Sequence, residues 1–140
     1  MTQQGEEKTV NLPCRKILIV DDNEVFLQLF RTKLFGCGFS VVTANSGIEA
    51  IRKFTRDSFD LVLTDIYMPG LNGNILARYI RNVSKDVPVI AVTAAPWLAN
   101  ESFDMVIEKP FELKFLMDSM EYYLSDNSEQ PEPCEVKYCG

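Results

Sequence analysis

Short apolar runs alternate with amphipathic stretches along most of the chain. The runs are short and are bounded by polar residues, which is typical of strands buried on both faces of a parallel sheet. They predict strands at residues 16–20, 40–43, 60–64, 88–92 and 104–108. Strands that alternate with helices in this way indicate a parallel sheet with helices on both faces and right-handed crossovers.

The intervening stretches are predicted to be helices, because apolar residues recur in them every three or four positions. Helices are expected at residues 23–35, from Ser46 onward, after the loop 68–73 and at 111–124. Ser46 and Glu49 have the spacing of a capping box. In the first helix the expected buried stripe is Val25, Phe26, Leu29, Phe30 and Leu34. A short segment at 97–103 is expected to form about two helical turns.

The length and composition of the chain suit one folded domain. With 140 residues the chain can build a core of its own. Residues 1–14 are expected to form a flexible N-terminal arm, and residues 15–125 the domain. Residues 126–140 are polar, acidic and proline-containing, so they are predicted to be a disordered tail.

The charge balance excludes some classes of partner. The chain has 14 basic and 20 acidic residues, a net charge of −6, which argues against broad binding to nucleic acid or to an anionic membrane. No apolar run approaches the roughly 18 residues of a membrane span, and the N-terminus lacks the apolar core of a secretion signal. We therefore expect a cytoplasmic protein. Because the chain has no histidine, any phosphoryl group it carries must be on a carboxylate or a hydroxyl.

Side chains that can handle a metal and a phosphoryl group follow four of the predicted strands. Asp21 and Asp22 follow the first strand, Asp65 the third, Thr93 the fourth and Lys109 the fifth. Ligands bind beyond the C-terminal strand ends of such sheets, whose commonest five-stranded order, 2-1-3-4-5, places Asp65 between the aspartate pair and Thr93. Carboxylates suit Mg²⁺, whereas a hydroxyl and a lysine suit a phosphoryl group.

Each of these residues also has a plainer interpretation when taken alone. An aspartate pair before a helix is typical of an N-cap with a neighbouring acid, and Asp65 is a common residue before a turn. Thr93 is also explained as a strand-end hydroxyl, and Lys109 as a surface lysine before the proline that starts a helix. Their joint occurrence at successive strand ends favours a functional site.

Four sequence segments resemble the receiver domain of two-component response regulators over roughly residues 16–124. They are ILIVDDN (17–23), FDLVLTDIYMPGLNG (59–73), VIAVTA (89–94) and EKPF (108–111). The resemblance implies an α/β flavodoxin-like fold, a doubly wound five-stranded parallel sheet of order 2-1-3-4-5. Because only sixteen positions separate Thr93 from Lys109, several fewer than is usual in this family, we expect a shortened fourth helix.

The resemblance also implies a metal site and its ligands. Asp22 would bind Mg²⁺ directly and Asp21 through water. Asp65 would contribute a carboxylate oxygen and Tyr67 its backbone carbonyl. A bulky aromatic at Tyr67 is expected to hinder the attacking water and so to make dephosphorylation slow to moderate.

The phosphoryl chemistry is implied in the same way. Asp65 would be the phosphoacceptor, with Thr93 donating a hydrogen bond to a phosphoryl oxygen and Lys109 pairing with it. Ala94 would leave the aspartate accessible, and the bond between Lys109 and Pro110 is expected to be cis.

The function implied is that of a stand-alone receiver. It would accept a phosphoryl group from a histidine kinase or a phosphotransfer protein, with Mg²⁺ as cofactor, and signal by binding an unidentified downstream protein. We expect a monomer or weak dimer that catalyses phosphoryl transfer only to itself, followed by its own dephosphorylation.

Two departures from the family keep a second hypothesis open. The short fourth helix and Val106, which occupies the position of a switch aromatic, favour an interaction module that kept the fold without switching. Trp97 would either fold back over the sheet or stay exposed as an anchor for a partner. A third class, the aspartyl-phosphate enzymes, needs a second acid two residues after the nucleophile, where this chain has Tyr67.

Overall fold

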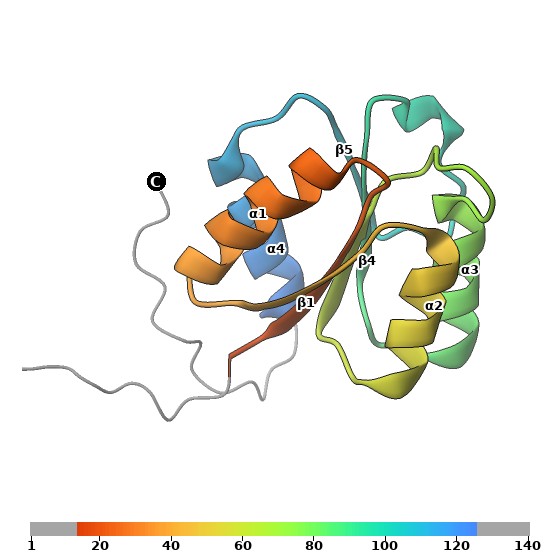
Figure 1. Cartoon of the computed structure of the whole chain (residues 1–140), viewed down its shortest axis with the longest axis horizontal. Helices are drawn as coiled ribbons and strands as arrows, with labels where there is room; N and C mark the ends of the chain where they lie inside the picture. The colour runs from red at the N-terminus through yellow and green to blue at the C-terminus, as the bar shows by residue number, and fades with distance from the viewer. Residues whose placement is uncertain (1–13, 126–140) are drawn as a thin grey trace, which may run out of the picture.

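The computed structural model describes residues 14–125, which form one five-stranded parallel sheet (Figure 1). The strand order is β2-β1-β3-β4-β5, as predicted. The strands are β1 (Lys16–Val20), β2 (Ser40–Ala44), β3 (Leu61–Thr64), β4 (Val89–Thr93) and β5 (Met105–Glu108). Each begins and ends within one residue of its predicted bounds.

Four helices cover the two faces of this sheet. They are α1 (Glu24–Gly36), α2 (Gly47–Arg56), α3 (Gly73–Val83) and α4 (Leu113–Leu124). Figure 1 shows α1 and α4 on one face and α2 and α3 on the other. The core is divided accordingly, because alternate residues of a strand point to opposite faces. Ile17 and Ile19 pack with α1 and α4, whereas Leu18 and Val20 pack in the α2–α3 layer.

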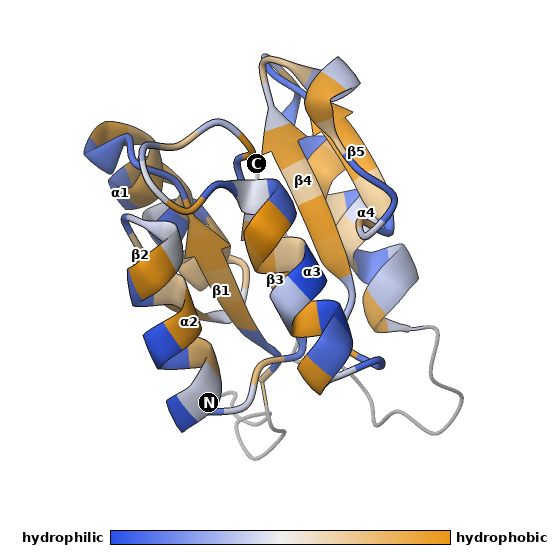
Figure 2. Cartoon of the chain, turned by 90° about the vertical axis from the view of Figure 1, so that its right-hand side faces the viewer, coloured by the Kyte–Doolittle hydropathy of each residue, from blue (hydrophilic) through white to orange (hydrophobic). Residues whose placement is uncertain are grey.

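Burial on both faces explains the unbroken apolar runs. All four residues of β3 and all five of β4 are buried, and the strands are almost continuously hydrophobic in Figure 2, whereas the helices have stripes. Burying one Leu or Ile side chain contributes roughly 1.5–3 kcal/mol. The sheet therefore fixes the strand ends from which the candidate site is built. Among the helices of residues 14–125, none combines the length and the apolar character that crossing a membrane requires.

Polar caps fix where α1 and α2 start. The side chain of Asn23 accepts hydrogen bonds from the N–H groups of Val25 and Phe26 at the start of α1. Ser46 accepts one from Glu49 at the start of α2. The Glu49 carboxylate in turn accepts the N–H of Asn45 at 2.7 Å. In a capping box this donor would be the N–H of Ser46 itself, so the observed donor lies one residue earlier.

The buried stripe of α1 differs from the prediction. Val25 is 77% exposed and Leu29 48% exposed, whereas Leu27, which the pattern left out, is only 2% exposed. Leu27 and Leu34 are seven residues apart and lie on the same side of the helix, so they set its inward face. Phe30 is half-buried beside them.

The expectation of two helical turns at 97–103 is wrong. The segment contains a single 3₁₀ turn, η2 (Pro96–Leu98). The rest of the loop is tied to α3 instead, because the Asn74 side chain donates to the Leu98 carbonyl at 2.8 Å and accepts the N–H of Asn100 at 2.9 Å. With so few residues between β4 and β5, these contacts replace further helical turns.

Candidate functional site

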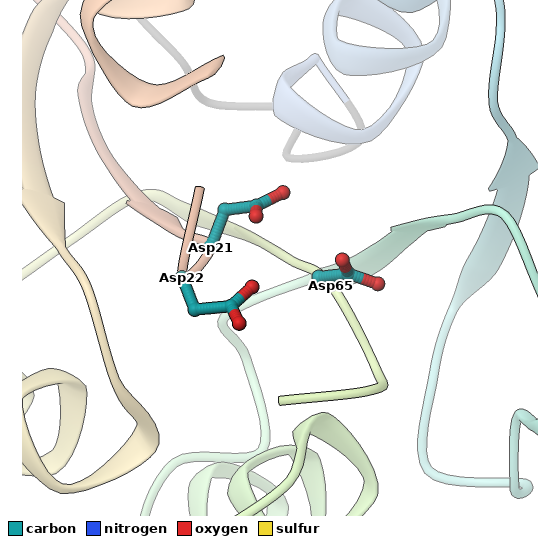
Figure 3. A group of neighbouring side chains, drawn as sticks. All are labelled: Asp21, Asp22 and Asp65. Carbon is teal, nitrogen blue, oxygen red and sulfur yellow. The ribbon is translucent and has the colours of Figure 1, made fainter. Parts of the chain in front are cut away.

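Three carboxylates converge where β1 and β3 end. Asp21 and Asp22 follow β1, and Asp65 follows β3, the neighbouring strand. One oxygen from each carboxylate lies within 4.8 Å of the others, and Figure 3 shows the three side chains turned into the same space. The prediction that these three residues lie close together at the strand ends is therefore confirmed.

Asp21 is the buried member of the group, with 1% of its surface exposed. Its Oδ1 accepts the N–H of Asn23 at 2.9 Å, and its Oδ2 accepts a hydrogen bond from the Lys109 ammonium at 2.8 Å. Burial raises the pKa of Asp21 above its ordinary value, since desolvation disfavours the charged form more than these hydrogen bonds favour it.

Asp65 is held by its backbone while its carboxylate stays reachable. Its N–H donates to the Val20 carbonyl at 3.0 Å, which continues the pairing of β3 with β1. Its Oδ1 accepts the N–H of Ile66 at 2.7 Å, and its Oδ2 lies 3.4 Å from the Lys109 nitrogen. The side chain is 14% exposed, enough for a reacting group to approach from solvent.

Lys109 directly follows β5, the edge strand, and reaches the acids from there. Its N–H donates to the Thr93 carbonyl at 2.9 Å, and the peptide bond to Pro110 is cis, as expected. The flexible side chain then spans to Asp21 and Asp65 together. Its ammonium therefore lies where a phosphoryl group on Asp65 would need a positive charge.

Thr93 lies at the predicted strand end and is buried, but its hydroxyl is engaged with the following loop. The hydroxyl oxygen accepts the N–H of Ala95 at 3.0 Å. Ala94 is exposed between them. Because the hydroxyl oxygen is the acceptor in this bond, its own hydrogen remains available for donation.

Gly73 is a site residue that the sequence interpretation missed. Its N–H donates to the Ile66 carbonyl at 2.8 Å, so the loop after β3 folds back on itself. A Cβ at this position would lie 2.7 Å from the Ile66 Cα and closer still to the Asp65 carbonyl oxygen. The signal in the sequence was a glycine directly after the helix-capping Asn72.

The donor set fits a hard divalent cation. The three carboxylates supply oxygen ligands, which Mg²⁺ prefers. Repulsion from Asp65 is one of the causes that raise the pKa of Asp21, and Lys109 offsets only part of the negative charge. Tyr67, whose carbonyl is the remaining predicted ligand, follows Asp65 by two residues, and its side chain is 77% exposed.

Comparison with known proteins identifies the family. Residues 17–121 match the model of the response regulator receiver domain. The chain belongs to this family. The sensor histidine kinase RcsC of Salmonella typhimurium is 32% identical over 114 residues, which make up 76% of this chain and 12% of RcsC. The response regulator MprA of Mycobacterium leprae is 32% identical over 108 residues, 73% of this chain and 47% of MprA. The chain thus spans less than half the length of either relative.

Solved structures show the same receiver fold. The response regulator TrrA from Thermotoga maritima, in complex with Mg²⁺ and BeF, superposes with a TM-score of 0.74 and 32% identity, covering 78% of this chain and 98% of TrrA. A structure of the histidine kinase ThkA in complex with TrrA matches with a TM-score of 0.73 and 34% identity, covering 79% of this chain and 99% of the matched chain. The predicted flavodoxin-like fold is therefore confirmed, and the chain is a signalling receiver domain.

Proposed function

We propose that this receiver domain accepts a phosphoryl group on Asp65 from a phosphohistidine of a histidine kinase or phosphotransfer protein, and signals by binding another protein. One observation carries the proposal. The reachable Asp65 carboxylate lies within one cluster with Asp21 and Asp22 and within 3.4 Å of the Lys109 ammonium. The kinase ThkA bound to TrrA supports a histidine kinase as the donor.

The transfer step uses the geometry of Asp65. Its carboxylate oxygen attacks the phosphorus in line with the phosphorus–nitrogen bond, which breaks as the acyl phosphate forms. The bonding electrons go to the imidazole nitrogen of the partner, which takes up a proton from solvent water. Lys109, already 3.4 Å from Oδ2, follows the developing negative charge on the phosphoryl oxygens.

Asp22 and Asp65 would hold Mg²⁺ directly, together with the Tyr67 carbonyl, and Asp21 would hold it through water. The indirect role suits Asp21, because one of its oxygens accepts from Asn23 and the other from Lys109. When bound, Mg²⁺ offsets charge on the carboxylates and on the transferring group. The complex of TrrA with Mg²⁺ and BeF supports the use of this cation.

Thr93 links the phosphorylation site to the next loop. If its hydroxyl turns toward a phosphoryl oxygen, the hydrogen bond from Ala95 to that hydroxyl is lost. The chain from Ala95 leads directly into η2. Val106 has no ring to swing, so we place the conformational response in this loop.

The exposed side chains of η2 are the proposed anchor for the downstream protein. Trp97 is 76% exposed and Leu98 44% exposed, while Ile75 on the neighbouring α3 is 51% exposed. Of the two alternatives for Trp97, the structure shows the exposed one. Large aromatic side chains of this kind commonly dominate binding energy when a partner buries them.

The second candidate is an interaction module that does not switch. The hydrogen bonds of Asn74 to the η2 loop favour it, because they hold the loop in place without phosphorylation. Acetyl phosphate with Mg²⁺, followed by intact-mass measurement and Trp97 fluorescence, separates the two. Labelling with a change in emission supports the switching receiver, and labelling without a change supports the static module. No labelling would refute the proposed function. Stand-alone action and the monomeric or weakly dimeric state stay predictions.

A further inference from the structure

An aromatic ring lies against the ammonium of Lys109. The Lys109 nitrogen is 4.3 Å from the centroid of the Phe26 ring, on α1. The same nitrogen is 2.8 Å from Asp21 Oδ2 and 3.4 Å from Asp65 Oδ2. The lysine thus contacts two carboxylates and the ring of a half-buried phenylalanine.

The position of Phe26 is itself fixed. Its N–H donates to the capping side chain of Asn23 at 3.1 Å. Its ring lies 4.5 Å from that of Phe30, which lies 5.4 Å from that of Phe111. Phe111 follows Lys109 by two residues, so the row of rings starts at the lysine ammonium and returns to the segment that carries the lysine.

The three rings also border a small cavity beside two of the acids. Phe26, Phe30 and Phe111 line, together with Asp21 and Asp65, a cavity of about 10 Å³. A space of this size has room for about one water molecule at most. At 4.3 Å from the Lys109 nitrogen, the Phe26 ring face takes the place of water on its own side of the ammonium.

A ring suits this place because it attracts the ammonium without using up its N–H donors. The ring quadrupole acts through space, so the hydrogen bonds remain available for carboxylate or phosphoryl oxygens. An aliphatic side chain would offer no such attraction, and the ammonium would then pair with Asp21 alone or turn out to solvent. Either arrangement would take the Lys109 ammonium away from Asp65.

We propose that Phe26 is a positioning residue that holds the Lys109 ammonium over Asp65 and so sets the rate of phosphoryl transfer. The proposal rests on the function proposed above. Phe26→Leu is expected to lower the second-order rate constant for labelling by acetyl phosphate with Mg²⁺ about 3- to 10-fold, in the range of a partly desolvated cation–π contact. Phe26→Tyr, which keeps the ring face, is expected to stay within about twofold of wild type.

Phe54→Leu provides the matched control. Phe54 is also half-buried on a helix and pairs with another ring, that of Phe59 at 6.1 Å, but in the opposite layer of the core. Its loss should destabilise the fold to a comparable extent and leave the rate unchanged. A rate reduced equally by Phe54→Leu and Phe26→Leu would overturn the proposal, because general loosening would then explain it.

A second measurement needs no phosphoryl transfer and does not depend on Phe26→Leu folding. Protons on the Lys109 side chain next to the ammonium lie close to the Phe26 ring and should show upfield-shifted resonances in wild-type protein, assigned with Lys109→Arg. The shift should be lost in Phe26→Leu and kept in Phe26→Tyr. Ordinary resonances in the wild type would overturn the proposal, even if Phe26→Leu fails to fold.

The two readouts separate this proposal from the proposed function. If wild-type protein is not labelled but the ring-shifted resonances are present, the phosphoryl function fails and the contact stands. If wild type and Phe26→Leu are labelled at equal rates, the phosphoryl function stands and the positioning role fails.

Discussion

The ammonium of Lys109 lies 2.8 Å from the buried carboxylate of Asp21. This contact joins the end of β5 to the end of β1, although β3 and β4 separate these strands in the sheet. Asp65 follows β3, one of the strands between them, and shares the same ammonium at 3.4 Å. The lysine therefore spans the site before any phosphoryl group arrives, and a divalent cation and a phosphoryl group would each redistribute its contacts.

Mg²⁺ is expected to raise the melting temperature of the protein by a few degrees, because it relieves repulsion among the three carboxylates and binds only the folded state. Asp22→Ala should abolish most of this rise. Thermal melts with and without millimolar Mg²⁺ measure it. Asp86→Ala is the control. Asp86 is exposed and precedes β4, so it lies at the N-terminal ends of the strands, away from the site. An equal rise in wild type and Asp22→Ala would contradict the assignment of this ligand.

Gly73→Ala is expected to destabilise the fold by about 2 kcal/mol, because the added methyl group meets the backbone of Asp65 and Ile66. It should also slow labelling, since the loop that carries Asp65 must shift. Denaturant unfolding and labelling kinetics test both effects. Gly36→Ala has open space around its Cβ and should leave the labelling rate unchanged. Full stability of Gly73→Ala would show that the loop is less tightly held than the structure indicates.

Glu49 is expected to make a small, pH-dependent contribution at the start of α2. The hydrogen bond from the Asn45 N–H is the main cause that lowers the pKa of Glu49 below its ordinary value of 4.5. Its stabilisation is therefore present above pH 4.5 and is lost as the pH falls through the lowered pKa. Because the side chain is about a third exposed, the effect should be a few tenths of a kcal/mol. Unfolding free energies of wild type and Glu49→Gln, compared at one pH well above and one well below 4.5, should converge at the acidic end. A constant difference would contradict this.

Phosphorylation is expected to change the fluorescence of Trp97, the single tryptophan in the chain. The Thr93 hydroxyl accepts the N–H of Ala95, two residues before Trp97, and this hydrogen bond is lost if the hydroxyl turns toward a phosphoryl oxygen. Thr93→Val should remove the change in emission, provided that mass measurement shows the variant is still labelled. An unchanged emission in labelled wild type would favour the static module.

The strand ends and the acidic cluster could be predicted from the sequence because they depend on local pattern and on the topology of parallel sheets. Asp21, Asp22 and Asp65 each directly follow an apolar run, and parallel strands bring such ends together. The placement of Lys109 followed from the same rule.

The remaining features depend on packing between distant segments. The inward face of α1 is set by contacts of Leu27 that helical spacing alone did not distinguish from those of Val25. The close approach of Gly73 to Asp65 and the contact of Phe26 with Lys109 involve backbone paths that no local pattern specifies. The loop forms only the single turn η2 because it is bound by Asn74, which precedes Leu98 by 24 residues.

Labelling at Asp65 is the decisive experiment for the proposed phosphoacceptor. Wild-type protein and Asp65→Asn are incubated with acetyl phosphate and Mg²⁺, and the intact mass of each is measured. Asp65→Asn keeps nearly the same shape but lacks a nucleophilic carboxylate. We expect a phosphoryl adduct on wild type that needs Mg²⁺, and none on the variant. An equal adduct on Asp65→Asn, or no adduct on a folded wild type, would contradict it.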